Sequence, residues 1–280
     1  MVDISTYVNN GKAFFNKSSF FNNNVRKKIE NKSGVDFEQL VEWCSTQCYN
    51  RPQNIIYIGN SEYVAFFLFF VYRHKETLEM LWLVVAEHVD KSFRIRLLDN
   101  EIQFKQYLWE LYLKYYLINN GYSLIKSPRN DGPDIEFNYA NHNVYIECVV
   151  PMVGDNEFKV PVMKTNGCGP IPFEQLKCRL KYAIDAKINK YKEYIDKGLV
   201  RRDDKLIIAV NTSDLDLYGE LMDAKDLLLL EVCSDNHLFE NNSFLDGVIY
   251  NHKSIFENDE TFKIYYIQKD YTVLTDSINI

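Results

Sequence analysis

The sequence has few features that would tie the protein to a membrane or to an oxidising compartment. Its most apolar run, residues 63–72, is about half the length of a membrane span. The first residues lack the basic and then apolar pattern of a secretory signal. The six cysteines are scattered without the paired spacing of a disulfide framework or a zinc site. We therefore expect a soluble, cytoplasmic protein with reduced thiols and no membrane role.

Internal repeats, low-complexity linkers and an excess of positive charge are also missing. The net charge of −7 argues against a protein that coats itself in nucleic acid. The charge is unevenly spread, because residues 104–205 carry sixteen Lys and Arg against thirteen Asp and Glu. A locally basic module of this kind is compatible with phosphate recognition. With 280 residues, of which 46% are hydrophobic, the chain can form one large or two smaller folded domains.

Two regions differ in their hydrophobic pattern. Residues 1–99 read mainly as helices, with a short strand at 55–58, and carry no motif that points to chemistry. From residue 100 the pattern predicts a helix that begins at 104 and is ended by residues 119–121, followed by strands at 122–126, 133–139 and 143–150. An amphipathic helix at 173–197 and strands at 205–210, 246–250 and 262–267 complete the prediction. This order predicts an α/β domain, a mixed sheet flanked by helices, over residues 100–280, preceded by a mainly helical region over 1–99.

The chemistry-bearing residues stand in a predicted hairpin at 133–150. Asp134 opens its first strand, and Glu147 lies in the middle of its second strand, thirteen positions later. Both carboxylates can thus lie at the same end of neighbouring strands, where a hard cation such as Mg²⁺ would bind them. Glu147 shares its strand face with Tyr145 and Val149, unlike an ordinary solvated acid. It is either a metal ligand, the partner of a core Lys or Arg, or a residue at an exposed sheet margin.

These residues resemble the PD-(D/E)XK nuclease superfamily, the restriction-endonuclease-like proteins. The match consists of Pro133-Asp134 and then Glu147-Cys148-Val149, with Glu110 on the preceding helix where the family often has an acid. The predicted order of elements over residues 104–211 is also similar to the family's α-β-β-β-α-β core. The resemblance implies metal-dependent hydrolysis of phosphodiester bonds in DNA or RNA. Asp134, Glu147 and Glu110 would then be catalytic acids that bind Mg²⁺ or Mn²⁺.

One position departs from the family pattern, because Val149 stands where a lysine is expected. In the family that lysine positions the attacking water and stabilises charge at the phosphate, and some members supply it from the following helix. In the helix at 173–197, Lys187 lies on the sheet-facing side and is the candidate; it is alternatively a lysine at the edge of the helix–sheet interface. Gln175 and Arg179 on a neighbouring stripe are candidate substrate-binding residues.

Two functions therefore remain open at the level of sequence. The first is a Mg²⁺-dependent nuclease that uses Asp134, Glu147, Glu110 and Lys187. The second is a protein of the same fold that binds nucleic acid or a protein partner without cleavage, the partner contacting the N-terminal region. The retained pair of acids favours the enzyme, whereas Val149 and the acidic overall charge favour the binding protein.

Overall fold

A computed structural model describes residues 4–50, 62–126, 131–154, 159–161, 172–215, 230–234, 237–252 and 264–275. The chain divides into two compact units, Met1–Tyr115 and Tyr116–Ile280. The division falls inside one helix, α7 (Glu101–Asn119). Each unit is described by itself below.

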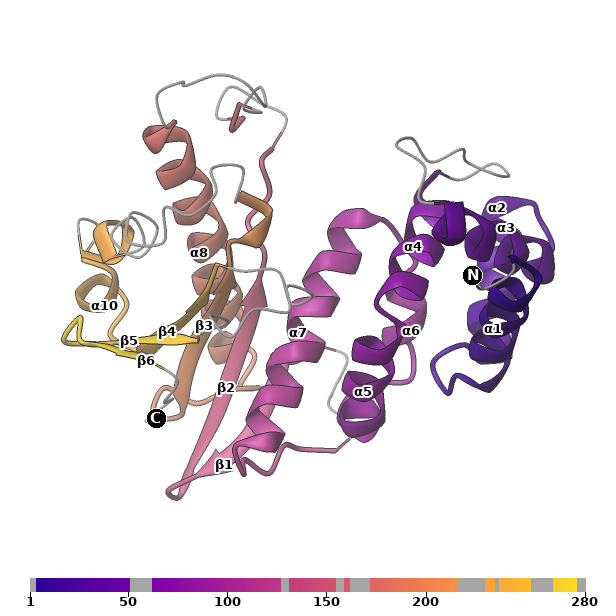
Figure 1. Ribbon diagram of the computed structural model, residues 1–280. Coiled ribbons are helices and arrows are strands. Elements are labelled where there is room, and N and C mark those ends of the chain that lie inside the picture. The colour runs from indigo at the N-terminus through magenta and orange to yellow at the C-terminus, as the bar shows by residue number, and fades with distance from the viewer. Residues whose placement is uncertain are drawn as a thin grey trace. The chain divides into compact units, whose positions relative to one another are not determined.

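The first unit is helical. Besides most of α7 it contains α1 (Ile4–Lys17), α2 (Asn23–Ser33), α3 (Phe37–Asn50), α4 (Glu62–Arg73), α5 (Lys75–Val85), η1 (Ala86–His88) and α6 (Phe93–Arg96) (Figure 1). Helix α3 packs against both α1 and α4. Their shared core is aromatic: Phe15 is fully buried, stacks on Tyr72 and meets the edge of Phe21. Burial of these large rings is the main source of stability for such a set of short helices.

The second unit is built on a mixed sheet with the strand order β1-β2-β3-β4-β5-β6. The strands are β1 (Ile135–Tyr139), β2 (His142–Val149), β3 (Lys205–Asn211), β4 (Leu245–Asn251), β5 (Tyr265–Gln268) and β6 (Val273–Thr275) (Figure 1). The central strands β2, β3 and β4 are parallel, whereas β1 pairs with β2, β5 with β4 and β6 with β5 in antiparallel ladders. The α/β class and the helical N-terminal region are thus confirmed.

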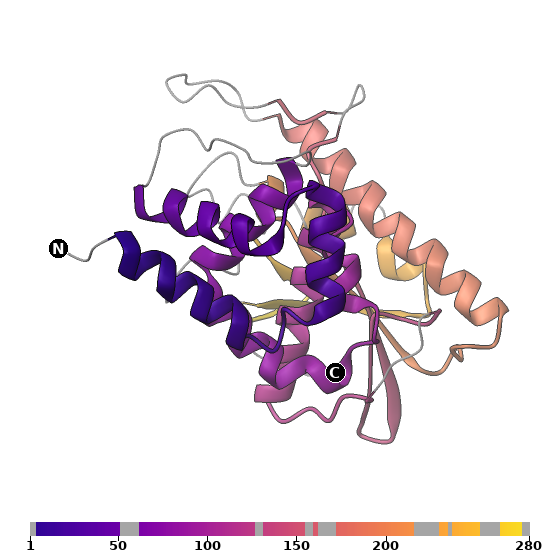
Figure 2. The same ribbon diagram turned by 90° about the vertical axis from the view of Figure 1, so that its right-hand side faces the viewer.

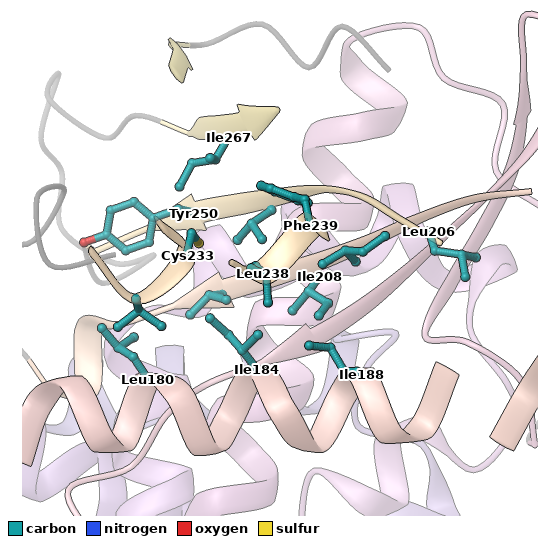
Figure 3. Packing of buried hydrophobic residues seen from close by; sticks show 14 of the residues in the cluster. Leu180, Ile184, Ile188, Leu206, Ile208, Cys233, Leu238, Phe239, Tyr250 and Ile267 are labelled. Atoms are coloured by element: carbon teal, nitrogen blue, oxygen red, sulfur yellow. The ribbon is translucent and has the colours of Figure 1, made fainter. Parts of the chain in front are cut away.

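The long helix α8 (Phe173–Asp196) connects β2 to the parallel strand β3 and covers one face of the sheet (Figure 2). Leu180, Ile184 and Ile188 recur at helical spacing and are buried. Figure 3 shows these three side chains pointing from α8 towards Ile208 of β3 and towards Leu238 of the short helix α10 (Leu238–Asn241). Tyr191 continues the attachment with its hydroxyl, which lies 2.9 Å from the carbonyl oxygen of Tyr145 and 2.6 Å from that of Ile207. The helix is therefore tied to both β2 and β3.

Some predicted elements differ from those observed. The segment at 122–126 forms a single antiparallel bridge between Leu124 and Phe137 instead of a full strand. Of its five residues only Leu124 is buried. The segment therefore has too few buried side chains to stabilise a longer strand beside β1. The C-terminal strand β6 was not predicted. The predicted strand at 55–58 lies outside the described residues.

Two expectations about the environment can be compared with the described residues. No disulfide bond joins Cys44, Cys148, Cys178 or Cys233, which are the cysteines whose side chains the structure describes. In the part of the chain that is described, no helix combines the length and the apolar character that crossing a membrane requires.

The β1–β2 hairpin turns over just two residues, Ala140 and Asn141, whereas the strands predicted at 133–139 and 143–150 left residues 140–142 between them. Both turn residues have positive φ, 47° and 67°, and Tyr139 pairs with His142. Two positive φ values in a two-residue loop identify a type I′ turn, whose twist matches that of paired strands. Alanine is strained in this left-handed conformation by about 1 kcal/mol, whereas asparagine tolerates it.

We therefore expect Ala140→Asn to raise the free energy of unfolding by about 1 kcal/mol, measured by urea denaturation. The reverse exchange at the next position, Asn141→Ala, should lower it by a similar amount. Both positions are exposed, so packing does not obscure the effect. A loss of stability in Ala140→Asn would contradict the turn.

Candidate active site

The hairpin places Asp134 next to Glu147. The β1–β2 ladder ends with the pair Ile135–Ile146, and one step beyond it Asp134 faces Glu147. Asp134 Oδ2 accepts a hydrogen bond of 2.8 Å from the backbone N–H of Cys148, which fixes the carboxylate beside β2. Glu147 lies on the sheet face that α8 covers, opposite Ile208 of β3, and its side chain is 0% exposed. The two-residue turn thus brings two acids side by side at the sheet.

Helix α8 supplies two lysines to these acids. Lys187 Nζ donates to Glu147 Oε2 at 2.7 Å and to Asp134 Oδ2 at 3.4 Å, so one ammonium group contacts both carboxylates. Lys190 Nζ donates to the same Glu147 oxygen at 2.9 Å. The structure therefore brings together Asp134, Glu147 and Lys187, three residues singled out from the sequence. The contact between Lys190 and Glu147 was not foreseen.

Tyr194 is a further member of the site that the sequence analysis missed. Its ring is buried, and its hydroxyl lies 3.1 Å from Glu147 Oε1 and 3.0 Å from the carbonyl oxygen of Gly132. It thereby ties the Gly-Pro turn before Asp134 to Glu147. The signal that could have found it is helical spacing, because positions seven residues apart lie on the same side of a helix and Tyr194 follows Lys187 by seven.

Burial and charge act in opposite directions on the ionisable groups. Burial, followed by the neighbouring Asp134, raises the pKa of the Glu147 carboxyl, while Lys187 and Lys190 oppose that rise. Burial lowers the pKa of Lys187, but Asp134 and Glu147 outweigh it, so the net pKa lies above the ordinary value of lysine. Burial and then Glu147 raise the pKa of the Tyr194 hydroxyl. Lys187 and Tyr194 consequently keep their protons throughout the neutral range.

The oxygens of Asp134 and Glu147 suit a hard divalent cation. Both lie within 3.4 Å of Lys187 Nζ, so they are at most about 6 Å apart. Among the described residues, no three His, Cys, Asp or Glu side chains gather as a metal-binding group. Mg²⁺ is nevertheless commonly held by one or two carboxylates together with waters and substrate phosphates. The donor set of Asp134 and Glu147 therefore fits Mg²⁺ or Mn²⁺.

Of the remaining candidates, one lies on α7 and two lie on α8. Glu110 is on α7 in the first unit, where it is buried and ion-paired with Lys114, and its role as a third acid stays a prediction. Arg179 lies against the segment that follows β2, since a Cβ on Gly154 would come within 1.7 Å of Arg179 Nη2. Gln175 and Arg179 precede Lys187 on α8 by about 18 and 12 Å along the helix axis. Val149 packs at the margin of the core under α8.

The ion pair of Glu147 and Lys187 should show strong energetic coupling. Removing one partner leaves a buried charge behind, so Glu147→Leu and Lys187→Met should each lower the free energy of unfolding by about 3 kcal/mol. Combining them removes both charges, and the double variant should lose much less than the two losses added together. Urea denaturation of the four proteins at neutral pH measures the coupling.

A control pair on the same helix is Lys181 and Asp185, which form an ion pair at 2.6 Å but are 47% and 44% exposed. The corresponding variants, Lys181→Met and Asp185→Leu, should show a coupling of at most about 0.5 kcal/mol. Equal couplings in the two cycles would contradict the buried network.

Comparison of the chain with protein-family models, with curated proteins and with solved structures finds no match. The second unit is a mixed six-stranded sheet with helices, and it follows a helical unit in the sequence.

Proposed function

We propose that the protein is a metal-dependent nuclease with a restriction-endonuclease-like core, which hydrolyses phosphodiester bonds in DNA or RNA. The observation that carries the proposal is the position of Lys187, whose ammonium group contacts Asp134 and Glu147 at once. This lysine comes from α8 and compensates for Val149 in β2. The order α7, β1, β2, α8, β3 further supports the core, although the segment at 122–126 contributes a bridge where the family has a strand.

Each residue of the site has a role under this proposal. Asp134 and Glu147 would hold Mg²⁺ or Mn²⁺, which supplies polarisation of the phosphoryl oxygen and a more acidic bound water. Lys187, fixed between the acids, would hold its proton, orient the attacking water and stabilise charge at the phosphate. Gln175 and Arg179, nearer the start of α8, would contact the nucleic acid, and Glu110 would be an additional acid.

The alternative is a binding protein of the same fold that does not cleave nucleic acid. It is favoured by the composition of the cluster, because the formal charges of Asp134 and Glu147 are balanced by Lys187 and Lys190. Such a network has no net charge and can stabilise α8 on the sheet without a metal ion. The N-terminal helices would then contact a protein partner.

Cleavage of labelled DNA and RNA with Mg²⁺ or Mn²⁺ distinguishes the two functions. We expect wild-type cleavage that depends on the metal, and Asp134→Asn, Glu147→Gln and Lys187→Ala should each reduce the rate at least about 100-fold. These groups act at the reacting phosphate, so their removal raises the barrier to the chemical step.

The matched control is Lys192→Ala, which removes an exposed lysine of α8. This variant should cleave nucleic acid at the wild-type rate. Equal activity in all variants would identify a contaminating nuclease. The absence of cleavage with either metal would sink the proposal and favour the binding protein.

The raised pKa of Glu147 also gives the metal affinity a characteristic pH dependence. A carboxyl group must lose its proton before it binds a metal, so the binding constant should fall as pH decreases through that pKa. We expect the midpoint of the fall above 4.5, the ordinary value for glutamate. Mn²⁺ binding measured by calorimetry from acidic to neutral pH tests this. A midpoint at or below 4.5 would show that burial and Asp134 do not control the carboxyl.

A further inference from the structure

Lys187 and Lys190 hold the same oxygen of Glu147 but differ in their surroundings. Lys187 contacts both acids, and its side chain is 15% exposed. The side chain of Lys190 is 39% exposed, and its ammonium group lies 5.6 Å from the centroid of the Tyr194 ring. Lys190 thus stands at the solvent side of the cluster, whereas Lys187 stands inside it.

A divalent cation that binds Glu147 competes with these ammonium groups, because all three carry positive charge and approach the same carboxylate. The Lys187 side chain is largely enclosed, at 15% exposed against 39% for Lys190. Lys190 can instead turn its ammonium group into water, where it recovers full hydration on its flexible four-carbon stem. Lys190 is therefore the group that gives way.

We propose that Lys190 is a substrate-binding residue that pairs with Glu147 until a divalent cation replaces it, and then contacts a phosphate of the nucleic acid. The inference rests on the proposed function and assigns a second lysine to it. A lysine released at the solvent side of the cluster remains about one helical turn from Lys187, next to the carboxylates where a phosphodiester would be held. A lysine is a point charge suited to a phosphate oxygen without fixed geometry.

In this role Lys190 has opposite effects on two affinities, that for the cation and that for nucleic acid. Its positive charge weakens binding of the cation, since it both repels the cation and occupies Glu147. The same charge strengthens binding of nucleic acid, because it adds one phosphate contact. A lysine that only held α8 on the sheet would not separate the two affinities in this way.

The test compares Lys190→Met with Lys192→Met, which removes an exposed lysine two residues away on the same helix. Calorimetric titration with Mn²⁺ at pH 8, without nucleic acid, should show tighter binding by Lys190→Met on the order of tenfold, and no change in Lys192→Met. With Ca²⁺ as a non-catalytic cation, a short single-stranded oligonucleotide should bind Lys190→Met more weakly. The slope of the logarithm of the oligonucleotide binding constant against the logarithm of salt concentration should be smaller in Lys190→Met, by the contribution of about one phosphate contact. Lys190→Arg should retain wild-type oligonucleotide affinity.

The outcomes separate this inference from the proposed function. Unchanged Mn²⁺ affinity in Lys190→Met would overturn the competition, and unchanged oligonucleotide affinity would overturn the phosphate contact, while the nuclease proposal would stand. If neither the wild type nor Lys190→Met bound Mn²⁺, both proposals would fail. Thermal unfolding of each variant shows that the comparison is made between folded proteins.

Discussion

The contact of the Lys187 ammonium group with two facing carboxylates is the interaction on which the second unit depends. The tight hairpin brings the carboxylates of Asp134 and Glu147 close together, and like charges at this distance repel. Glu147 is also fully enclosed, so its charge has lost water as a partner. A cation between the two acids removes both penalties at once. The register of the hairpin and the position of α8 on the sheet are consequently linked, because a shift of the strands or of the helix would separate Lys187 from the acids.

Helix α8 achieves this with two adjacent stripes. The stripe of Leu180, Ile184 and Ile188 packs on β3 and sets the distance between helix and sheet. The stripe of Lys187 and Tyr194 reaches across to Glu147 in β2. Apolar contacts are not directional, so they permit small rotations of the helix, whereas the hydrogen bonds to Glu147 do not. The apolar stripe provides the energy of attachment, and the polar stripe determines the orientation at the site.

The sequence was sufficient for the parts of this arrangement that depend on local periodicity. Alternation along β2 correctly put Glu147 on the face of Tyr145, and helical spacing put Lys187 towards the sheet. Asp134 lies beside Glu147 only because the turn is centred between Ala140 and Asn141. The turn places Ala140 in a left-handed conformation that alanine rarely adopts, so the known sequence preferences of two-residue turns would not predict it. Helical spacing puts Tyr194 on the side of α8 that carries Lys187. Its hydroxyl contacts with Glu147 and with the carbonyl oxygen of Gly132 depend on the tertiary arrangement, so the sequence could not predict them.

Under the proposed function, the composition of the cluster follows from chemistry more than from stability. Apolar side chains of similar volume would hold α8 on the sheet as well as or better than buried ions, because they need no desolvation of charge. The chain instead places Asp134, Glu147, Lys187 and Lys190 within one network, with Tyr194 holding the second oxygen of Glu147. Carboxylates offer ligands to a hard cation, and the lysines offer charge to a phosphate. An arrangement that costs folding energy and supplies both kinds of group is what the proposed nuclease function would require.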